Sequence, residues 1–117
     1  MKKLMTLLMV LALIALCSGL SLAEEAKELS GKDLYKGDCK VCHTEDSDAG
    51  EYTPMTYIME QWEEFFDELW TETHGEVVSQ KDKTKKVTEM FDEEMLKKIR
   101  KFCVDHAADS EQPMTCG

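Results

Sequence analysis

Residues 39 to 43 read Cys-Lys-Val-Cys-His, so two cysteines stand two residues apart and a histidine directly follows the second. Three chemistries use such a pattern: covalent attachment of haem, zinc binding and thiol–disulfide exchange. A thioredoxin-like thiol site needs a βαβ frame, and a structural zinc site needs four ligands, usually from two closely spaced pairs. The elements around the motif and the other potential ligands of the chain therefore decide among the three.

Residues 1 to 23 have the pattern of a secretory signal. Two lysines precede an apolar run from Leu4 to Leu16, and small residues lead to Ala23, after which we expect cleavage. The run is shorter than a membrane span requires. The large residue before Cys17 makes a lipid anchor the less expected alternative. The sequence therefore predicts an exported protein that has no stable membrane insertion after the signal is removed.

The remaining chain, residues 24–117, is strongly acidic and small enough to form one domain. It contains all 24 acidic residues, whereas two of the 14 lysines and arginines lie in the signal. Such a charge disfavours nucleic acid and anionic membranes as partners. It suits basic patches on other proteins, or it serves only to keep an exported monomer in solution.

Hydrophobic periodicity predicts three helices and no strand. The first begins at Ser30, a capping residue, and contains the cysteine motif. The second follows Pro54 and covers residues 55 to 70, with a broad apolar stripe opposite acidic side chains. The third covers residues 92 to 106, with acids in its first turn and basic residues later. We therefore expect an all-α domain.

An all-α domain offers no βαβ frame for thiol exchange, and no second ligand pair for zinc follows Cys39, Cys42 and His43. Covalent haem is favoured, because two intervening residues let both sulfurs reach the two vinyl groups of one porphyrin. The imidazole of His43 could then bind the iron. Haem attachment takes place outside the cytoplasm, which agrees with the predicted export. Zinc and thiol chemistry stay as less favoured alternatives.

The same segments resemble the class I c-type cytochromes. The first helix of that family reads Gly, then an aliphatic–aromatic pair, then Cys-x-x-Cys-His, and Gly31 and Leu34-Tyr35 precede the motif here in that order. The resemblance implies a small class I cytochrome c-like fold, in which the N- and C-terminal helices cross over one covalently bound haem c. Ile99 and Phe102 are the expected contacts of Gly31 and Tyr35 at this crossing.

The tail from His106 to Pro113, with Cys116 near the end, resembles small single-haem cytochromes of anaerobic, metal-reducing bacteria, as do Gln61-Trp62 and Phe65-Phe66. This resemblance implies a periplasmic one-electron carrier in respiration, of an anaerobic kind, with redox proteins as partners. Such a carrier is not an enzyme. The alternative is a haem enzyme or gas sensor with an open iron position, for which the sequence offers no acid–base pair near the motif.

The resemblance also implies the ligands of the iron. His43 is the expected proximal ligand, and Pro54 resembles a family proline whose carbonyl accepts a hydrogen bond from that histidine. Met90, two residues before the last helix, is the expected second ligand. The alternatives are His74, His106, Met114 and an open position. A sulfur ligand would raise the reduction potential, whereas two histidines would lower it.

Lys81, Lys83, Lys85 and Lys86 form the one basic cluster in this acidic chain. The simpler interpretation is a solvated loop. The functional one is a docking patch near the haem edge, where positive charge would steer an acidic redox partner.

Cys103 and Cys116 would both enter an oxidising compartment, where the cysteines of small domains usually pair. A helix that ends near Asp109 leaves enough chain for Cys116 to fold back to Cys103. We therefore predict a disulfide between them. The alternative is that Cys103 is a small core residue and Cys116 is free or bonded to another molecule.

Overall fold

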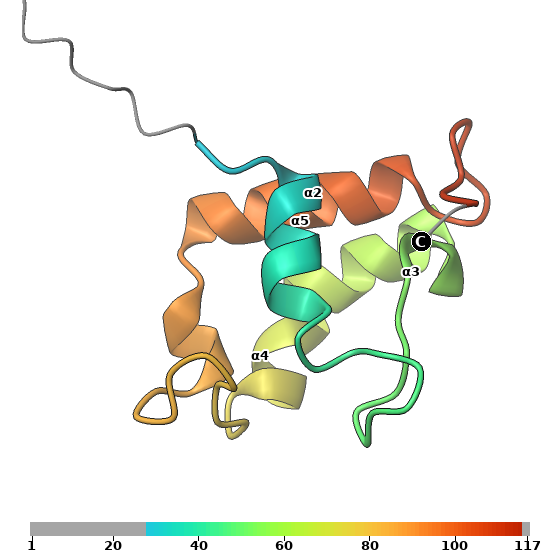
Figure 1. Ribbon diagram of the computed structural model, residues 1–117. Coiled ribbons are helices and arrows are strands. Elements are labelled where there is room, and N and C mark those ends of the chain that lie inside the picture. Colours follow the sequence, from blue (N-terminus) through green and yellow to red (C-terminus); the bar gives the residue numbers. More distant parts are fainter. Residues whose placement is uncertain (1–27, 116–117) are drawn as a thin grey trace, which may run out of the picture.

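The computed structural model describes residues 28–115 (Figure 1). The predicted signal peptide and Cys116, with its predicted disulfide, lie outside the described residues. Within residues 28–115 the chain is mostly helical and contains no strand; its β-type pairing is an isolated antiparallel bridge between Val78 and Lys86. The expected helical class is therefore confirmed. No helix of this part of the chain is long and apolar enough to cross a membrane.

Within residues 28–115, eight helical segments form three longer helical units and two short turns. In chain order they are α2 (Gly31–Leu34), η1 (Tyr35–Cys39), η2 (Pro54–Thr56), α3 (Met59–Glu64), η3 (Phe65–Leu69), α4 (Trp70–His74), η4 (Val87–Met90) and α5 (Glu93–Asp105). Segments α2 and η1 are continuous, as are α3, η3 and α4. Segments η1 and η3 are π-helical turns, whereas η2 and η4 are 3-10 turns.

The first helix begins as its capping residues predict. The Ser30 hydroxyl accepts a hydrogen bond from the Asp33 backbone N–H at 3.2 Å, and the Asp33 carboxylate accepts one from the Ser30 N–H at 3.2 Å. This reciprocal capping box satisfies two N–H groups that the first turn would otherwise leave without partners. The last helix is capped in a related way, because the Asp92 carboxylate accepts from the Met95 N–H at 2.8 Å.

Segments α2 and α5 cross (Figure 1), and their backbones approach closely at Gly31. A Cβ at Gly31 would lie 2.1 Å from the carbonyl oxygen of Lys98, so only glycine permits this approach. Tyr35 packs on Phe102 with ring centroids 5.4 Å apart, and Ile99 is 1% exposed at the crossing. The predicted contacts between the first and last helices are therefore present.

The middle helix starts later and ends later than its apolar stripe predicts. Pro54 begins a short 3-10 turn, the backbone is extended at Tyr57 and Ile58, and α3 starts only at Met59. The Asp109 carboxylate accepts a hydrogen bond from the Met59 N–H at 2.7 Å, which fixes this start against the end of α5. Residues before Met59 are therefore not part of the helical stripe, and the helix continues to the end of α4.

Trp62 connects the middle helix to the turn before it. Its indole N–H donates to the Pro54 carbonyl at 2.8 Å, and both residues are buried. We expect Trp62→Phe to lower the free energy of unfolding by about 1–3 kcal/mol, because the buried carbonyl would lose its partner. Thermal unfolding followed by circular dichroism measures this loss. A melting temperature equal to that of the wild type would show that this bond does not stabilise the fold.

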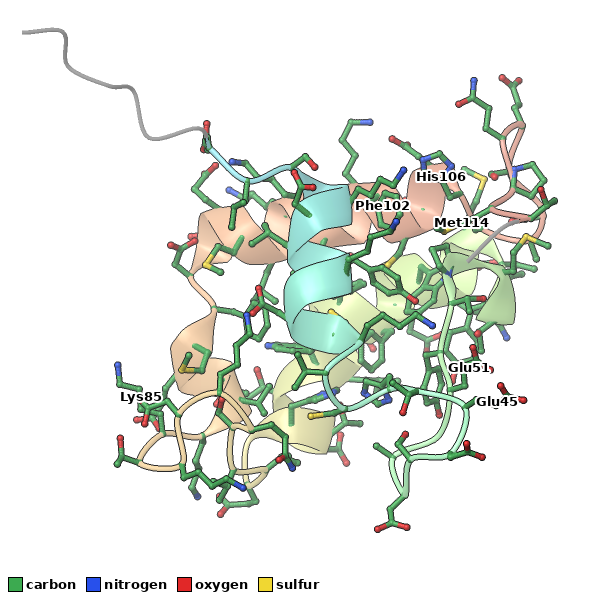
Figure 2. The ribbon with its side chains drawn as sticks, viewed as in Figure 1. Glu45, Glu51, Lys85, Phe102, His106 and Met114 are labelled. Carbon is green, nitrogen blue, oxygen red and sulfur yellow. The ribbon has the colours of Figure 1, made fainter. Side chains whose placement is uncertain are left out.

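The tail after α5 folds back onto the end of that helix. The Met114 N–H donates to the His106 carbonyl at 3.1 Å, and the His106 ring nitrogen Nδ1 bonds to the Gln112 carbonyl at 2.8 Å. Figure 2 shows His106 and Met114 together at this end of the molecule. The tail therefore returns toward α5 as predicted, at least as far as Met114.

Candidate functional site

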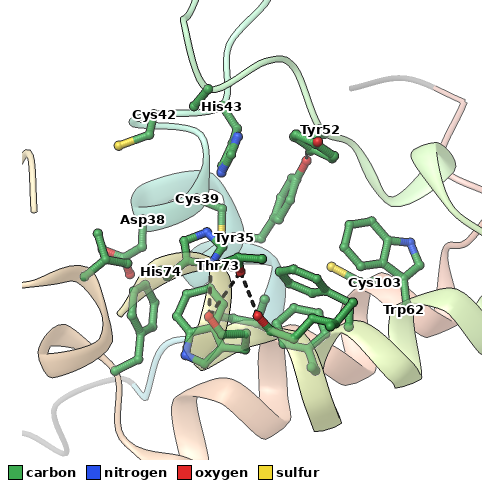
Figure 3. Close-up of a pocket in the computed structure, with 18 of the residues that line it drawn as sticks. Tyr35, Asp38, Cys39, Cys42, His43, Tyr52, Trp62, Thr73, His74 and Cys103 are labelled. Atoms are coloured by element: carbon green, nitrogen blue, oxygen red, sulfur yellow. Dashed lines mark hydrogen bonds between the residues drawn. The ribbon is translucent and has the colours of Figure 1, made fainter. Parts of the chain in front are cut away.

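A cavity of about 440 Å³ lies between the first helix, the middle helix and the segment that leads into α5. Figure 3 shows the side chains of Cys39, Cys42 and His43 around it. All three line the cavity, so the structure brings the whole motif to one space. Pockets of this size typically hold ligands as large as drugs or cofactors.

Many of the side chains that line the cavity are aromatic, and we call them the aromatic wall. They are Tyr35, Tyr52, Tyr57, Trp62, Phe65, Phe66, Trp70 and Phe91. The two tyrosines at positions 52 and 57 come from the loop after the motif, and their ring centroids lie 5.9 Å apart. Neither tyrosine was predicted for the site. Tyr52 lies in a loop, which has no periodicity from which to infer an inward face, and Tyr57 lies within the predicted helix of residues 55 to 70 but outside its apolar stripe.

Both π-helical turns contribute to this wall. Tyr35 and Cys39 are the first and last residues of η1, and Phe65, Phe66 and Leu69 belong to η3. Hydrogen bonds in a π-turn run to the fifth residue rather than the fourth, which shifts the side chains that follow. The Lys40 N–H makes such a bond to the Tyr35 carbonyl at 3.1 Å. Such turns occur frequently at functional sites.

Both motif cysteines are partly buried, and both are free thiols. Cys39 ends η1, and the chain then turns so that the Cys42 and His43 N–H groups donate to the Cys39 carbonyl at 3.3 and 3.1 Å. Burial raises the pKa of the Cys39 thiol to about 12, and the nearby charge of Asp38 adds to the effect. This thiol is therefore protonated at neutral pH, which does not suit thiol–disulfide exchange.

His43 is held by the loop that follows it, although not by the predicted residue. Its Nδ1 lies 3.0 Å from the Gly50 carbonyl oxygen. A carbonyl can only accept, so Nδ1 carries the proton and Nε2 keeps its lone pair. Gly50 has φ of 80°, a left-handed conformation that turns the loop here and that few residues other than glycine adopt.

The predicted hydrogen bond between His43 and the Pro54 carbonyl is not made in this structure. That carbonyl accepts the indole N–H of Trp62 instead, as described above. The loop turns early, at Gly50, so a backbone carbonyl reaches the imidazole four residues before the proline. The glycine in this loop was the available signal, because a tight turn was needed somewhere between the motif and the next helix.

His74, at the end of α4, lines the same cavity. Its ring stacks on Trp70 with centroids 4.2 Å apart and planes at 24°, and its centroid lies 6.1 Å from that of His43. Burial lowers the pKa of His74; the hydrogen bond to the Trp70 carbonyl opposes this shift, and neighbouring His43 adds to it. The His74 ring is therefore mainly neutral at neutral pH, and its unprotonated nitrogen has a lone pair that could bind a metal.

Met90 does not line the cavity that contains His43. It ends η4 and lines a separate small pocket, together with Val41, Cys42 and Lys81. The next residue, Phe91, lines both this pocket and the main cavity, and its ring packs edge-on against Trp70 with centroids 5.4 Å apart. Met90 is the last residue of the 3-10 turn and the backbone is extended at Phe91, and of the two only Phe91 reaches the main cavity. Met90 therefore does not line the cavity of His43 in this structure, and its role as the second ligand stays a prediction.

The other two candidate ligands lie away from the main cavity. Neither His106 nor Met114 lines the cavity, and both lie at the tail end of α5 (Figure 2). Of the four candidate residues, the structure brings only His74 to the cavity with His43. Among the described residues, no three His, Cys, Asp or Glu side chains are grouped so as to bind a metal ion by themselves.

The basic cluster is partly neutralised by ion pairs. Lys81 pairs with Asp38, which lines the cavity, and Lys86 pairs with Glu76. The first pair connects the lysine loop to the rim of the cavity. Both pairs have exposed members and add little to stability. A docking role for this loop stays a prediction.

The site thus combines two thiols, two imidazoles and eight aromatic side chains around one cavity. Comparison of the chain with protein-family models, with curated proteins and with solved structures found no match. The functional argument therefore depends on the motif and on the geometry of this cavity.

Proposed function

We propose that this protein is an exported, single-haem c-type cytochrome that carries one electron at a time in respiration. The observation that supports it best is the opening of Cys39, Cys42 and His43 onto one cavity of about 440 Å³. A motif of this spacing is suited to covalent attachment of one porphyrin. The cavity supplies space for it directly beside the motif.

The residues of the cavity suit haem in three further respects. The aromatic wall matches the apolar faces of a porphyrin. The buried, protonated thiol of Cys39 is available to form a thioether, as is Cys42. The bond from Nδ1 of His43 to the Gly50 carbonyl leaves Nε2 for the iron, and such a bond orients a metal-binding imidazole and raises its basicity.

Bound haem would supply an iron that exchanges one electron between its ferric and ferrous states. The protein would hold the group, exclude water with the aromatic wall, and fix the axial imidazole. The resemblance to class I cytochromes of anaerobic metal-reducing bacteria favours a periplasmic location and redox proteins as partners. The acidic surface favours partners with basic patches.

A redox titration of the purified full chain tests this function. The protein is produced in a bacterium that has c-type haem attachment machinery, and its visible spectrum is followed as the potential is varied. We expect a haem spectrum that changes reversibly with potential. The fraction of reduced protein should follow the Nernst curve of a one-electron transfer. A protein that folds and is exported without haem, or whose haem has no reversible titration, would contradict the proposal.

A further inference from the structure

His43, in the loop after η1, and His74, at the end of α4, both line the main cavity. Their centroids are 6.1 Å apart and their planes are inclined by 70° (Figure 3). A metal–imidazole bond is about 2 Å long and the ring centre lies about 1 Å behind the nitrogen, so two imidazoles on opposite sides of one metal have centres roughly 6 Å apart. The observed separation therefore leaves room for a single metal ion between the rings.

The hydrogen bonds of both rings leave the same nitrogen for such a metal. Nδ1 of His43 donates to the Gly50 carbonyl at 3.0 Å. Nδ1 of His74 lies 2.7 Å from the Thr73 hydroxyl and 3.2 Å from the Trp70 carbonyl. The Thr73 hydroxyl donates its own proton to the Leu69 carbonyl at 2.8 Å, so its oxygen accepts from His74. Nε2 of each ring is therefore a lone-pair donor.

The His74 ring is also fixed in orientation. It is stacked on Trp70 at 4.2 Å, and the edge of Phe65 lies against it at 5.9 Å between centroids. The helix ends immediately afterwards at Gly75, where a Cβ would lie 2.6 Å from the Thr71 carbonyl oxygen. The packing of Trp70 and Phe65 on the imidazole, and the close backbone approach at Gly75, would hold His74 in position before a metal binds.

We propose that His74 is the second iron ligand, opposite His43, so that the haem iron has two histidine ligands and no free coordination position. This inference rests on the proposed function. It predicts a low-spin haem with a lower reduction potential than a histidine–methionine pair would give. It also disfavours an enzyme or gas sensor, because neither could bind a substrate at a closed iron.

Three proteins test the inference: the haem-loaded wild type, His74→Ala, and Met90→Ala as the matched control. We expect a low-spin wild type that lacks the weak sulfur-to-iron charge-transfer band of the oxidised form. His74→Ala should become high-spin, should bind added imidazole, and should return to low spin when it does. Met90→Ala, whose side chain lies in the separate pocket, should have the spectrum and potential of the wild type.

A sulfur-to-iron band in the wild type, its loss in Met90→Ala, or an unchanged low-spin spectrum in His74→Ala would each overturn the inference. If His74→Ala does not accumulate, His74→Met replaces it, and the sulfur-to-iron band should then appear. Haem staining after denaturing electrophoresis separates this inference from the proposed function. If the proteins stain for haem but the spectra exclude His74 as the iron ligand, only this inference is rejected. If the wild type does not stain, both this inference and the proposed function are rejected.

Discussion

Replacement of both Cys39 and Cys42 by alanine is expected to leave a largely unfolded chain that is degraded in the cell. Without covalent haem, the aromatic wall would surround a cavity of about 440 Å³. At about 24 cal/mol per Å³ of cavity, an empty space of this size corresponds to at most about 10 kcal/mol. This upper bound is comparable with the whole stability of a small domain, about 5–15 kcal/mol. The fold would then have little net stability without its cofactor.

Far-ultraviolet circular dichroism and thermal unfolding of the purified variant measure this effect. Val41→Ala is the matched control, because Val41 lies between the two cysteines but is 44% exposed and does not line the main cavity. We expect the control to keep the helical spectrum and melting temperature of the wild type. A compact, helical double variant with a sharp thermal transition would show that the fold does not need the haem.

Gly31→Ala is expected to lower the free energy of unfolding by about 3 kcal/mol or more, the upper end of the usual loss from overpacking. The added Cβ would lie 2.1 Å from the Lys98 carbonyl oxygen and 3.0 Å from Cβ of Phe102. Neither neighbour is the end of a flexible side chain, so α2 and α5 would have to separate. Since Tyr35 and Ile99 pack at this crossing, their contacts would loosen as well.

Gly37→Ala is the matched control for the helix crossing. Gly37 lies in the same helical unit, and the nearest atom to its added Cβ is the Lys81 ammonium nitrogen at 4.0 Å. Alanine there is expected to be neutral or to stabilise by about 0.5–1 kcal/mol, because it restricts the unfolded chain. For a domain of this size, Gly31→Ala should lower the melting temperature by more than about 10 °C. Equal melting temperatures for both variants would contradict the proposed tight crossing.

The helices were predictable from the sequence because the residues that start them, and the glycine at which two of them cross, can be recognised in it. Ser30 with Asp33, and Asp92 before the last helix, are caps that act within one turn. The contact of Gly31 with the last helix was expected from the resemblance to class I cytochromes, and the structure has it. The helical class and the crossing of the first and last helices could therefore be inferred before the structure was known.

The positions of the candidate iron ligands, and of the residue that hydrogen-bonds to His43, were harder to predict because they depend on the path of the loops. The sequence distance from the motif to Pro54 and to Met90 favoured those residues, but the path of the chain decides which atoms meet. The turn at Gly50 supplies the carbonyl for His43, and Phe91 rather than Met90 turns into the cavity. The backbone carbonyl of Trp70 and the hydroxyl of Thr73 orient His74, and neither contact has a sequence pattern of its own.

The middle helix shows that hydrophobic periodicity alone does not predict where a helix starts or which face it buries. Met55 and Ile58 fit the apolar stripe, yet both are exposed, because the extended segment before α3 separates them from the helix. The π-helical turn at Phe65–Leu69 also changes the face that the stripe presents. Contacts from distant residues, such as the bond from the Met59 N–H to Asp109, determine where this helix starts.

The intact mass of the purified protein under denaturing conditions tests the central claim most directly. Denaturation removes any group that is only bound in the cavity, whereas thioether bonds at Cys39 and Cys42 would keep the haem on the chain. We predict the mass of residues 24–117 plus one haem, and the polypeptide mass alone for the variant with both cysteines replaced by alanine. A folded wild-type protein with only the mass of its polypeptide would contradict the account.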